Sequence, residues 1–187
     1  MRERILTAFK ESAEIKLAFV EKYLERIERL AKEIAQRLQK GGTVYLFGNG
    51  GSAADAQHIA AELIGRYRKE RRPLAAVALT TDTSVLTALG NDYGFEEVFA
   101  RQVEALAKPQ DVVIGISTSG RSKNVYKGLL KAKEKGALTA AFLGGDGGII
   151  EEIVDYPFVV PSFETPRIQE CHITLGHTLC EIIEELL

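Results

Sequence analysis

The chain has 187 residues, 45% of them hydrophobic and 27% charged, and its formal net charge at pH 7 is −2. This length and apolar content predict one globular domain, residues 1–187, with an ample core. The slight acidic excess argues against a dedicated nucleic-acid-binding protein, and the apolar runs are far shorter than the roughly 18 to 20 residues that span a bilayer. The charged start, Met1–Arg4, does not lead into a signal-peptide core, so the cytoplasm is the expected location.

Residues 2–40 contain neither Gly nor Pro, and their apolar residues recur at helical spacing. This pattern predicts one long helix or two in succession, ending at Gly41–Gly42. Such a length exceeds what a small domain needs to cover a sheet. We therefore expect these N-terminal helices to pack against another copy of the chain, with an intrachain helical hairpin as the alternative.

After Gly42, short apolar runs alternate with helical stretches. The expected strands cover 43–48, 75–79, 111–116, 138–143 and 157–160, and the expected helices cover 52–64, 84–89, 95–107, 122–135, 148–154 and 166–186. Near-continuous apolar strands separated by helices predict an α/β fold with a doubly wound, five-stranded parallel sheet. Ligands of such folds bind at the carboxyl ends of the strands. The charged connection 66–73 is expected to be solvated surface.

Two small-residue loops follow predicted strands and open predicted helices. The first is Gly48–Ser52, and the second is Ser117–Ser122, which contains three serines and a threonine. Glycines let the backbone approach a ligand, and the free N–H groups at a helix start favour an anion. The hydroxyls of the second loop add donors for a phosphate, whereas ordinary helix capping by one of them is the alternative. Together the loops predict a site for a phosphorylated sugar.

Imidazole and carboxylate side chains accompany these loops. His58 and Glu62 are four residues apart on the helix after the first loop, a spacing that suits a divalent metal, acid–base chemistry or a plain surface pair. On the last helix, Glu170 and His177 are seven apart and share a face, so helix geometry prefers Glu170 to Gln169 as the partner of His177. A structural pair between His177 and Glu181 is the alternative.

Three other features carry weaker predictions. Cys171 and Cys180 lie nine apart on one predicted helix, a rise of about 13.5 Å, so we expect buried thiols and no disulfide. The segment 91–94 is typical of a turn between helices, and 144–148 is typical of a loop at a strand end.

With these residues assembled, the chain resembles the sugar isomerase (SIS) domain family over nearly its full length. Within that family it is most similar to the branch that isomerises heptose phosphates. The segments that carry the resemblance are 48–52, 55–67, 90–92, 117–122 and 167–170, followed by His177. Together they are specific, although none would be so alone. The resemblance implies a flavodoxin-like SIS fold.

The resemblance also implies an activity and its residues. The activity is isomerisation of sedoheptulose 7-phosphate to D-glycero-D-manno-heptose 7-phosphate through an enediol, the first step towards ADP- or GDP-heptose. The implied phosphate ligands are Ser117, Thr118, Ser119 and Ser122. The other implied substrate contacts are Asn49, Gly50, Gly51, Ser52, Glu62, Asn91, Asp92 and Gln169. One zinc ion per subunit would be held by His58, Glu62, Gln169 and His177, and Glu62 and His177 would also be the acid–base pair.

The resemblance thus names Gln169 where helix geometry prefers Glu170. We follow the resemblance, on the expectation that Gln169 precedes the first regular turn of the last helix. We also predict a homotetramer, with residues 2–40 at its centre and active sites completed by a neighbouring chain.

Two rival functions stay open. One branch of the family binds the bacterial replication initiator and resembles the chain at 81–88, but it lacks the carboxylate and imidazole at Glu62 and His177, so the enzyme is favoured. The third possibility is an isomerase or sensor of another phosphosugar.

Overall fold

The computed structural model describes residues 1–187. Its centre is a parallel sheet of five strands in the order β2-β1-β3-β4-β5. The strands are β1 (Val44–Gly48), β2 (Ala76–Ala78), β3 (Val112–Ser117), β4 (Leu138–Gly144) and β5 (Tyr156–Val160). In the register, Val44 pairs with Ala76 on one side and with Val112 on the other. The predicted doubly wound, flavodoxin-like order is confirmed.

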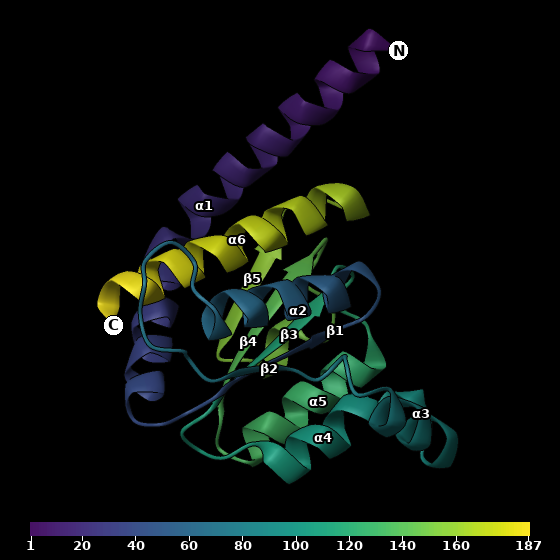
Figure 1. Ribbon diagram of the computed structural model, residues 1–187. Helices are drawn as coiled ribbons and strands as arrows, with labels where there is room; N and C mark the ends of the chain where they lie inside the picture. Colours follow the sequence, from purple (N-terminus) through teal and green to yellow (C-terminus); the bar gives the residue numbers. More distant parts are fainter.

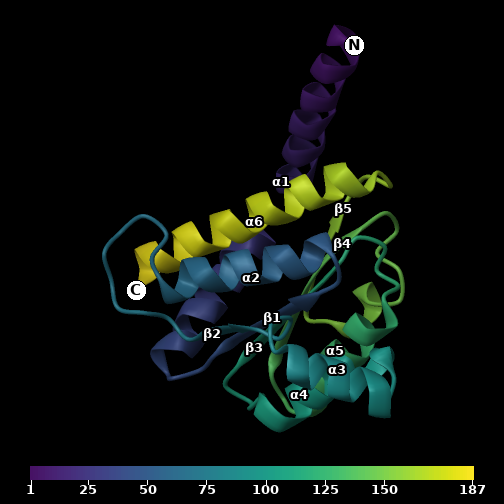
Figure 2. The ribbon, with the colours of Figure 1, turned by 45° about the vertical axis from the view of Figure 1, so that its right-hand side comes forward.

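Helices cover both faces of this sheet (Figures 1 and 2). They are α1 (Arg2–Gln39), α2 (Gly51–Ile64), α3 (Thr83–Asp92), α4 (Val98–Leu106), α5 (Lys123–Glu134) and α6 (Thr165–Leu186), with short 3-10 turns η1 (Phe95–Glu97) and η2 (Glu151–Ile153). The expected helix 148–154 is thus only a 3-10 turn. The reason is that Gly147 and Gly148 have positive φ angles and belong to the preceding loop.

The sheet separates two apolar cores. Successive strand residues point to opposite faces, so Val44 and Leu46 enter a core of 29 buried residues shared with α1, α2 and α6. Tyr45 and Phe47 enter a second core of 17 buried residues, which is shared with α4 and α5. Burial on both faces explains why the strands are continuously apolar.

The N-terminal segment is a single helix, so the alternatives of two successive helices and of a helical hairpin are wrong. Its second half packs on β5 and α6, where the Val159 N–H donates to the Tyr23 hydroxyl (3.2 Å). Its first half extends away from the body of the molecule (Figure 1) and leaves Leu6, Phe9 and Leu17 exposed.

The expectation of a solvated connection at 66–73 is partly wrong. The Arg71 side chain is only 8% exposed and lies 3.3 Å from the carboxylate of Glu184, which is 2% exposed. The charge pattern alone predicts surface because Glu184, the partner of Arg71, lies 113 residues further along the sequence. The segment is therefore anchored to α6 rather than free.

The cysteines and the apolar character of the helices are two further subjects of prediction. Cys171 and Cys180 are buried thiols with no disulfide, as predicted, and burial raises the pKa of each to about 12. None of the helices combines the length and the apolar character that crossing a bilayer requires.

Candidate active site

Both predicted loops leave the sheet at its topological switch point. Strands β1 and β3 are neighbours, β1 is followed by α2 and β3 by α5, and the chain passes to opposite faces of the sheet. Crevices of open α/β sheets form at such points. Two reciprocal amide hydrogen bonds, of 2.9 and 2.8 Å, join Asn49 of the first loop to Asn124 at the start of α5. The two loops are therefore braced into one surface.

The first loop brings α2 close to α6. Gly50, with φ of 57°, is the N-cap of α2, and Gly51 is its first residue. A Cβ atom on Gly51 would overlap with the side-chain amide of Gln169, so the glycine is what allows this approach. Ser52 is buried, 4% exposed. The structure thus places the predicted contacts Gly51 and Gln169 side by side.

The second loop gathers hydroxyls at the start of α5. The oxygens of Ser117 and Ser122 are 3.0 Å apart, and Ser119 accepts a hydrogen bond from the backbone N–H of Arg121 (3.2 Å). Ser122 is the N-cap residue, but its side chain makes no capping hydrogen bond. The Ser122 side chain therefore does not cap the first backbone N–H groups of α5, and such a helix start can bind an anion.

Arg121 is directed to the neighbouring loop. Its guanidinium forms two hydrogen bonds with Asp146 (2.7 and 2.6 Å), and these bonds lower the pKa of Asp146 to about 2, with help from the Gly148 N–H. Gly120, with φ of 64°, lies so close to the Gly147 carbonyl that a Cβ would overlap with it. Between the second loop and the loop 144–148 is a small cavity of about 150 Å³, lined in part by Thr118, Ser119 and Phe163.

The predicted acid–base residues meet between α2 and α6. The helices run side by side (Figure 2), with Ile59 against Gly176 and Gly51 against Gln169. The His58 Nε2 atom lies 3.2 Å from Glu62 Oε1 and 3.1 Å from His177 Nε2, and the two imidazole rings are 4.9 Å apart. Three side chains from distant parts of the sequence therefore form one cluster.

This cluster fits a zinc ion. The ligand atoms of His58, Glu62 and His177 all lie within 4.8 Å of one another. Tetrahedral zinc with ligands at about 2.0 to 2.1 Å spaces them roughly 3.3 Å apart. The separations of 3.2 and 3.1 Å are close to this value, and two imidazoles with one carboxylate are a usual set for a catalytic zinc.

The structure separates Gln169, Glu170 and Glu181, the three side chains of α6 considered as partners of His177. Helix α6 begins at Thr165, so Gln169 already lies in regular helix, and the reason given for favouring it is wrong. The geometric preference for Glu170 is also wrong, because Glu170 pairs with Arg167 (3.0 Å) and faces a cavity beside α1. Glu181 pairs with Arg68 and not with His177. Gln169 lies two turns before His177, a rise of about 12 Å, and its role as a metal ligand stays a prediction.

Asn91 and Asp92 do not join the cluster. They are exposed, they end α3 instead of forming the expected turn, and their side chains bond to each other (2.7 Å). Helix α3 packs with α4 and η1, on the face of the sheet opposite α2 and α6. Within one chain these two residues therefore sit apart from His58 and His177.

Sequence reasoning assigned no role to two residues near the cluster. Asp55 lies one turn before His58, and its Oδ2 atom is buried without a hydrogen-bond partner. Burial raises the pKa of Asp55, while the nearby charges of His58 and His177 act in the opposite direction. The Tyr67 ring lies 5.7 Å from the His177 ring. The spacing of three residues between Asp55 and His58 could have identified Asp55 from the sequence. The position of Tyr67 beside His177 is visible only in the folded structure.

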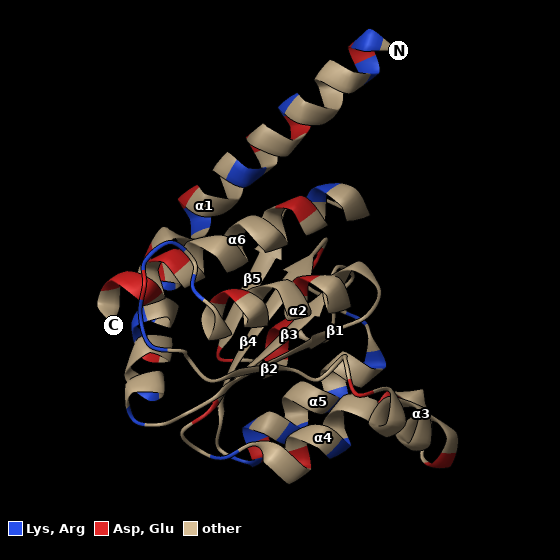
Figure 3. Ribbon diagram, viewed as in Figure 1, with Lys and Arg blue, Asp and Glu red and all other residues tan.

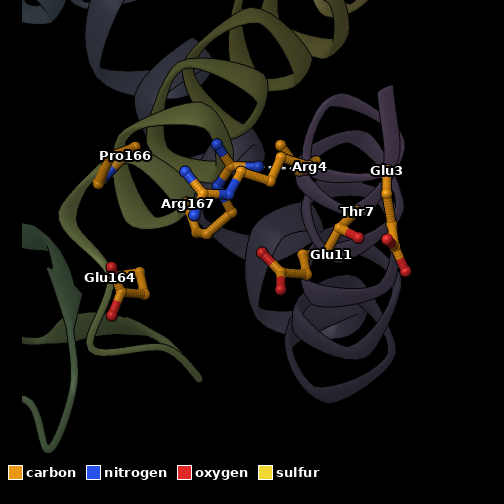
Figure 4. Close-up of a pocket in the computed structure, with 8 residues that line it drawn as sticks. Glu3, Arg4, Thr7, Glu11, Glu164, Pro166 and Arg167 are labelled. Atoms are coloured by element: carbon orange, nitrogen blue, oxygen red, sulfur yellow. Dashed lines mark hydrogen bonds between the residues drawn. The ribbon is translucent and has the colours of Figure 1, made fainter. Parts of the chain in front are cut away.

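A larger cavity lies outside this site. It has a volume of about 560 Å³ and lies between the first turns of α1 and the start of α6. Figure 4 shows Arg4 and Arg167 side by side within it, and Arg167 donates a hydrogen bond to the Ala8 carbonyl. None of the predicted site residues lines this cavity, so it is separate from the candidate active site.

Comparisons with known proteins agree with this geometry. The SIS domain family model matches residues 9–144. The chain is 65% identical to the phosphoheptose isomerase of Aquifex aeolicus over 187 residues, covering 100% of this chain and 98% of the relative. It is similar to the solved phosphoheptose isomerase structures from Neisseria gonorrhoeae (TM-score 0.93, 45% identity, 98% of each chain) and Francisella tularensis (TM-score 0.94, 36% identity, 98% of this chain and 97% of the other).

Proposed function

The chain belongs to the SIS domain family, and we propose that it isomerises sedoheptulose 7-phosphate to D-glycero-D-manno-heptose 7-phosphate. The observation that carries the proposal is the cluster of His58, Glu62 and His177 beside two braced loops at the switch point. The identities to phosphoheptose isomerases, over nearly whole chains, support the same substrate.

The phosphate end of the substrate is assigned to the second loop. Ser117, Thr118, Ser119 and Ser122 offer hydroxyl donors, and the first turn of α5 offers backbone N–H groups. Since Arg121 is held by Asp146, hydroxyls and amides would bind the phosphate. This arrangement fixes one end of the sugar.

The distance from the first loop to the histidine cluster suits a long sugar. From Gly51 to His58, α2 rises about 10.5 Å. A seven-carbon chain ending in a phosphate also extends roughly 10 Å, given carbon–carbon bonds of about 1.5 Å. Because Asn49 and Asn124 join the first loop to the start of α5, we propose that a substrate with its phosphate at the second loop crosses the first loop and presents its first carbons to the histidine cluster. Asn49, Gly50, Gly51, Ser52, Asn91, Asp92 and Gln169 are the proposed contacts along its length.

The proton transfers are assigned to Glu62 and His177. The Glu62 carboxylate takes a proton from carbon 1 of the ketose, which leaves an enediol, and returns it to carbon 2 to form the aldose. His177 gives a proton to the oxygen on carbon 2 and takes one from the oxygen on carbon 1, so that protons balance. His58, Glu62, Gln169 and His177 would hold a zinc ion, which when bound polarises the carbonyl and stabilises negative charge on its oxygen.

The proposed assembly is a homotetramer. The first half of α1 exposes Leu6, Phe9 and Leu17, which a neighbouring chain would bury. A neighbour would also bring its own Asn91 and Asp92, which lie away from the cluster of their own chain. The proposed setting is the cytoplasm, where two unpaired cysteines are usual, and the product would supply activated heptose for lipopolysaccharide.

The test is incubation of the purified protein with sedoheptulose 7-phosphate, with and without added zinc, following the heptose phosphate by NMR. Turnover is expected, and it should fall by about 10³-fold in Glu62→Gln and in His177→Gln. Glu152→Gln, the same change at an exposed position, is the matched control and should retain turnover. Folded wild-type protein without turnover would instead favour the initiator-binding branch or another phosphosugar.

A further inference from the structure

The last turns of α6 contain a buried carboxylate that binds backbone. Glu184 is 6% exposed and accepts hydrogen bonds from the N–H groups of Tyr67 (2.9 Å), Arg68 (2.8 Å) and Lys69 (2.5 Å). Hydrogen bonds from amides to a carboxylate are charge-assisted and stronger than neutral ones. One side chain therefore fixes three consecutive residues of the connection after α2.

Arg71 extends this contact to the end of α2. It pairs with Glu184, and its guanidinium donates to the carbonyls of Glu62 and Leu63 (2.9 Å each). These carbonyls belong to the last turn of α2 and have no partner within the helix. That turn has no basic residue of its own, so Arg71 supplies the positive charge. We name Glu184, Arg71 and the backbone of 67–69 the Glu184 clip.

The Glu184 clip lies at the acid–base pair. It holds the backbone carbonyl of Glu62, and His177 is two turns before Glu184 on the same face of α6. The Tyr67 ring is 5.7 Å from the His177 ring at an angle of 34°, within the range of paired aromatic rings. Figure 3 shows the basic connection lying beside the acidic last turns of α6.

Electrostatics keep the Glu184 clip closed at neutral pH. Burial acts to raise the pKa of Glu184, but the N–H groups of Lys69, Arg68 and Tyr67 and the charge of Arg71 outweigh it, so the pKa lies below its ordinary value. The carboxylate thus stays ionised under the conditions in which the amide bonds are needed.

We propose that Glu184 and Tyr67 are positioning residues for His177: Glu184 fixes Tyr67, and the Tyr67 ring fixes the imidazole beside Glu62. The effect on catalysis rests on the proposed function, but the contact itself does not. If the proposal holds, loss of the Tyr67 ring frees the imidazole without removing any group that touches the substrate.

The experiment compares four variants: Glu184→Gln and Tyr67→Leu, which break the contact, and Tyr67→Phe and Glu185→Gln, which leave it in place. Glu185 is the matched control, since it is the exposed carboxylate next to Glu184 on the same helix. The chain has three histidines, so the His177 ring signals of histidine-labelled protein can be assigned by substitution. We expect these signals to move in the first two variants and to match wild type in the other two.

The kinetic result should follow the same division. In Glu184→Gln and Tyr67→Leu, kcat is expected to fall about 10- to 100-fold with KM nearly unchanged, since small displacements of a catalytic group cost this much. Unchanged His177 signals in folded Tyr67→Leu would overturn the proposal. Tyr67→Leu keeps every hydrogen bond of the Glu184 clip, so the test can still be made if Glu184→Gln does not fold. If wild type lacks turnover, the proposed function fails, and the NMR signals still decide the contact.

Discussion

The two ends of α2 are held in different ways. At its start, glycines and amides bring backbone segments together, and the nearby Arg121–Asp146 pair is more than half exposed, 56% and 55%. At its end, the Arg71–Glu184 pair is almost fully buried, 8% and 2% exposed. The proposed phosphate end thus depends on backbone shape, and the end with the histidines depends on buried charge. Each end should respond to a different kind of substitution.

Removal of a proposed zinc ligand from α2 should have the largest effect. His58→Ala takes one of three ligands from the cluster, and zinc affinity is expected to fall by more than about 100-fold, since changes behind the ligands already cost up to that much. The measurement is competition with a chromogenic chelator. His172→Gln is the control, because His172 is buried and bonded to the Leu143 carbonyl. Equal affinity in His58→Ala and wild type would contradict the zinc site.

The same contrast explains what could be predicted from the sequence. The first and second loops are local patterns of strand, small residues and helix start, and the structure has them where expected. The parallel sheet with helices on both faces follows from alternating helices and buried strands, whereas the flavodoxin-like strand order was implied by the resemblance. Local chemistry is therefore visible in a single segment of sequence.

The end of α2 with the histidines could not be predicted in the same way, because it depends on contacts between distant segments. The partner of Arg71 lies 113 residues further on, so the local sequence of 66–73 predicts a solvated connection. Helix geometry also prefers Glu170 to Gln169, but it considers α6 alone. In the structure, Glu170 pairs with Arg167, and Arg167 donates a hydrogen bond to the Ala8 carbonyl of α1. The resemblance names Gln169 instead, and the structure places that side chain against Gly51 of the first loop, while its role as a metal ligand stays a prediction.

A substitution in the Glu184 clip should lower stability in a pH-dependent way. Glu184→Gln leaves Arg71 buried without its partner, and the free energy of unfolding at pH 7 should fall by about 3 kcal/mol. Because the folded pKa of Glu184 is lowered, its contribution is complete above the unfolded pKa, about 4.3, and is lost as pH falls through the folded value. Urea unfolding should thus show the difference from wild type shrinking below about pH 4. A difference that stays constant with pH would count against this origin.

A substitution at the phosphate end should act through shape. Gly120→Ala places a Cβ against the Gly147 carbonyl at a positive φ, and we expect a loss of about 3 kcal/mol in the free energy of unfolding. Gly41→Ala is the matched control: its φ is also positive, 81°, but it has no atom within 4 Å, so only the backbone cost of about 1 kcal/mol remains. Equal losses in the two variants would show that the contact between the loops contributes nothing.

The exposed ion pair at the phosphate end should have the smallest effect. Arg121→Ala and Asp146→Asn remove two good hydrogen bonds, but solvent screens charges that are this exposed, and both partners are hydrated once separated. The unfolding midpoint of either variant should match wild type within error, and the double variant should show no coupling. Differential scanning calorimetry at low and high salt gives the measurement. Destabilisation that persists at high salt would mean that this pair resembles the buried one, because salt screens buried pairs much less than exposed ones, and the contrast between the two ends of α2 would then be wrong.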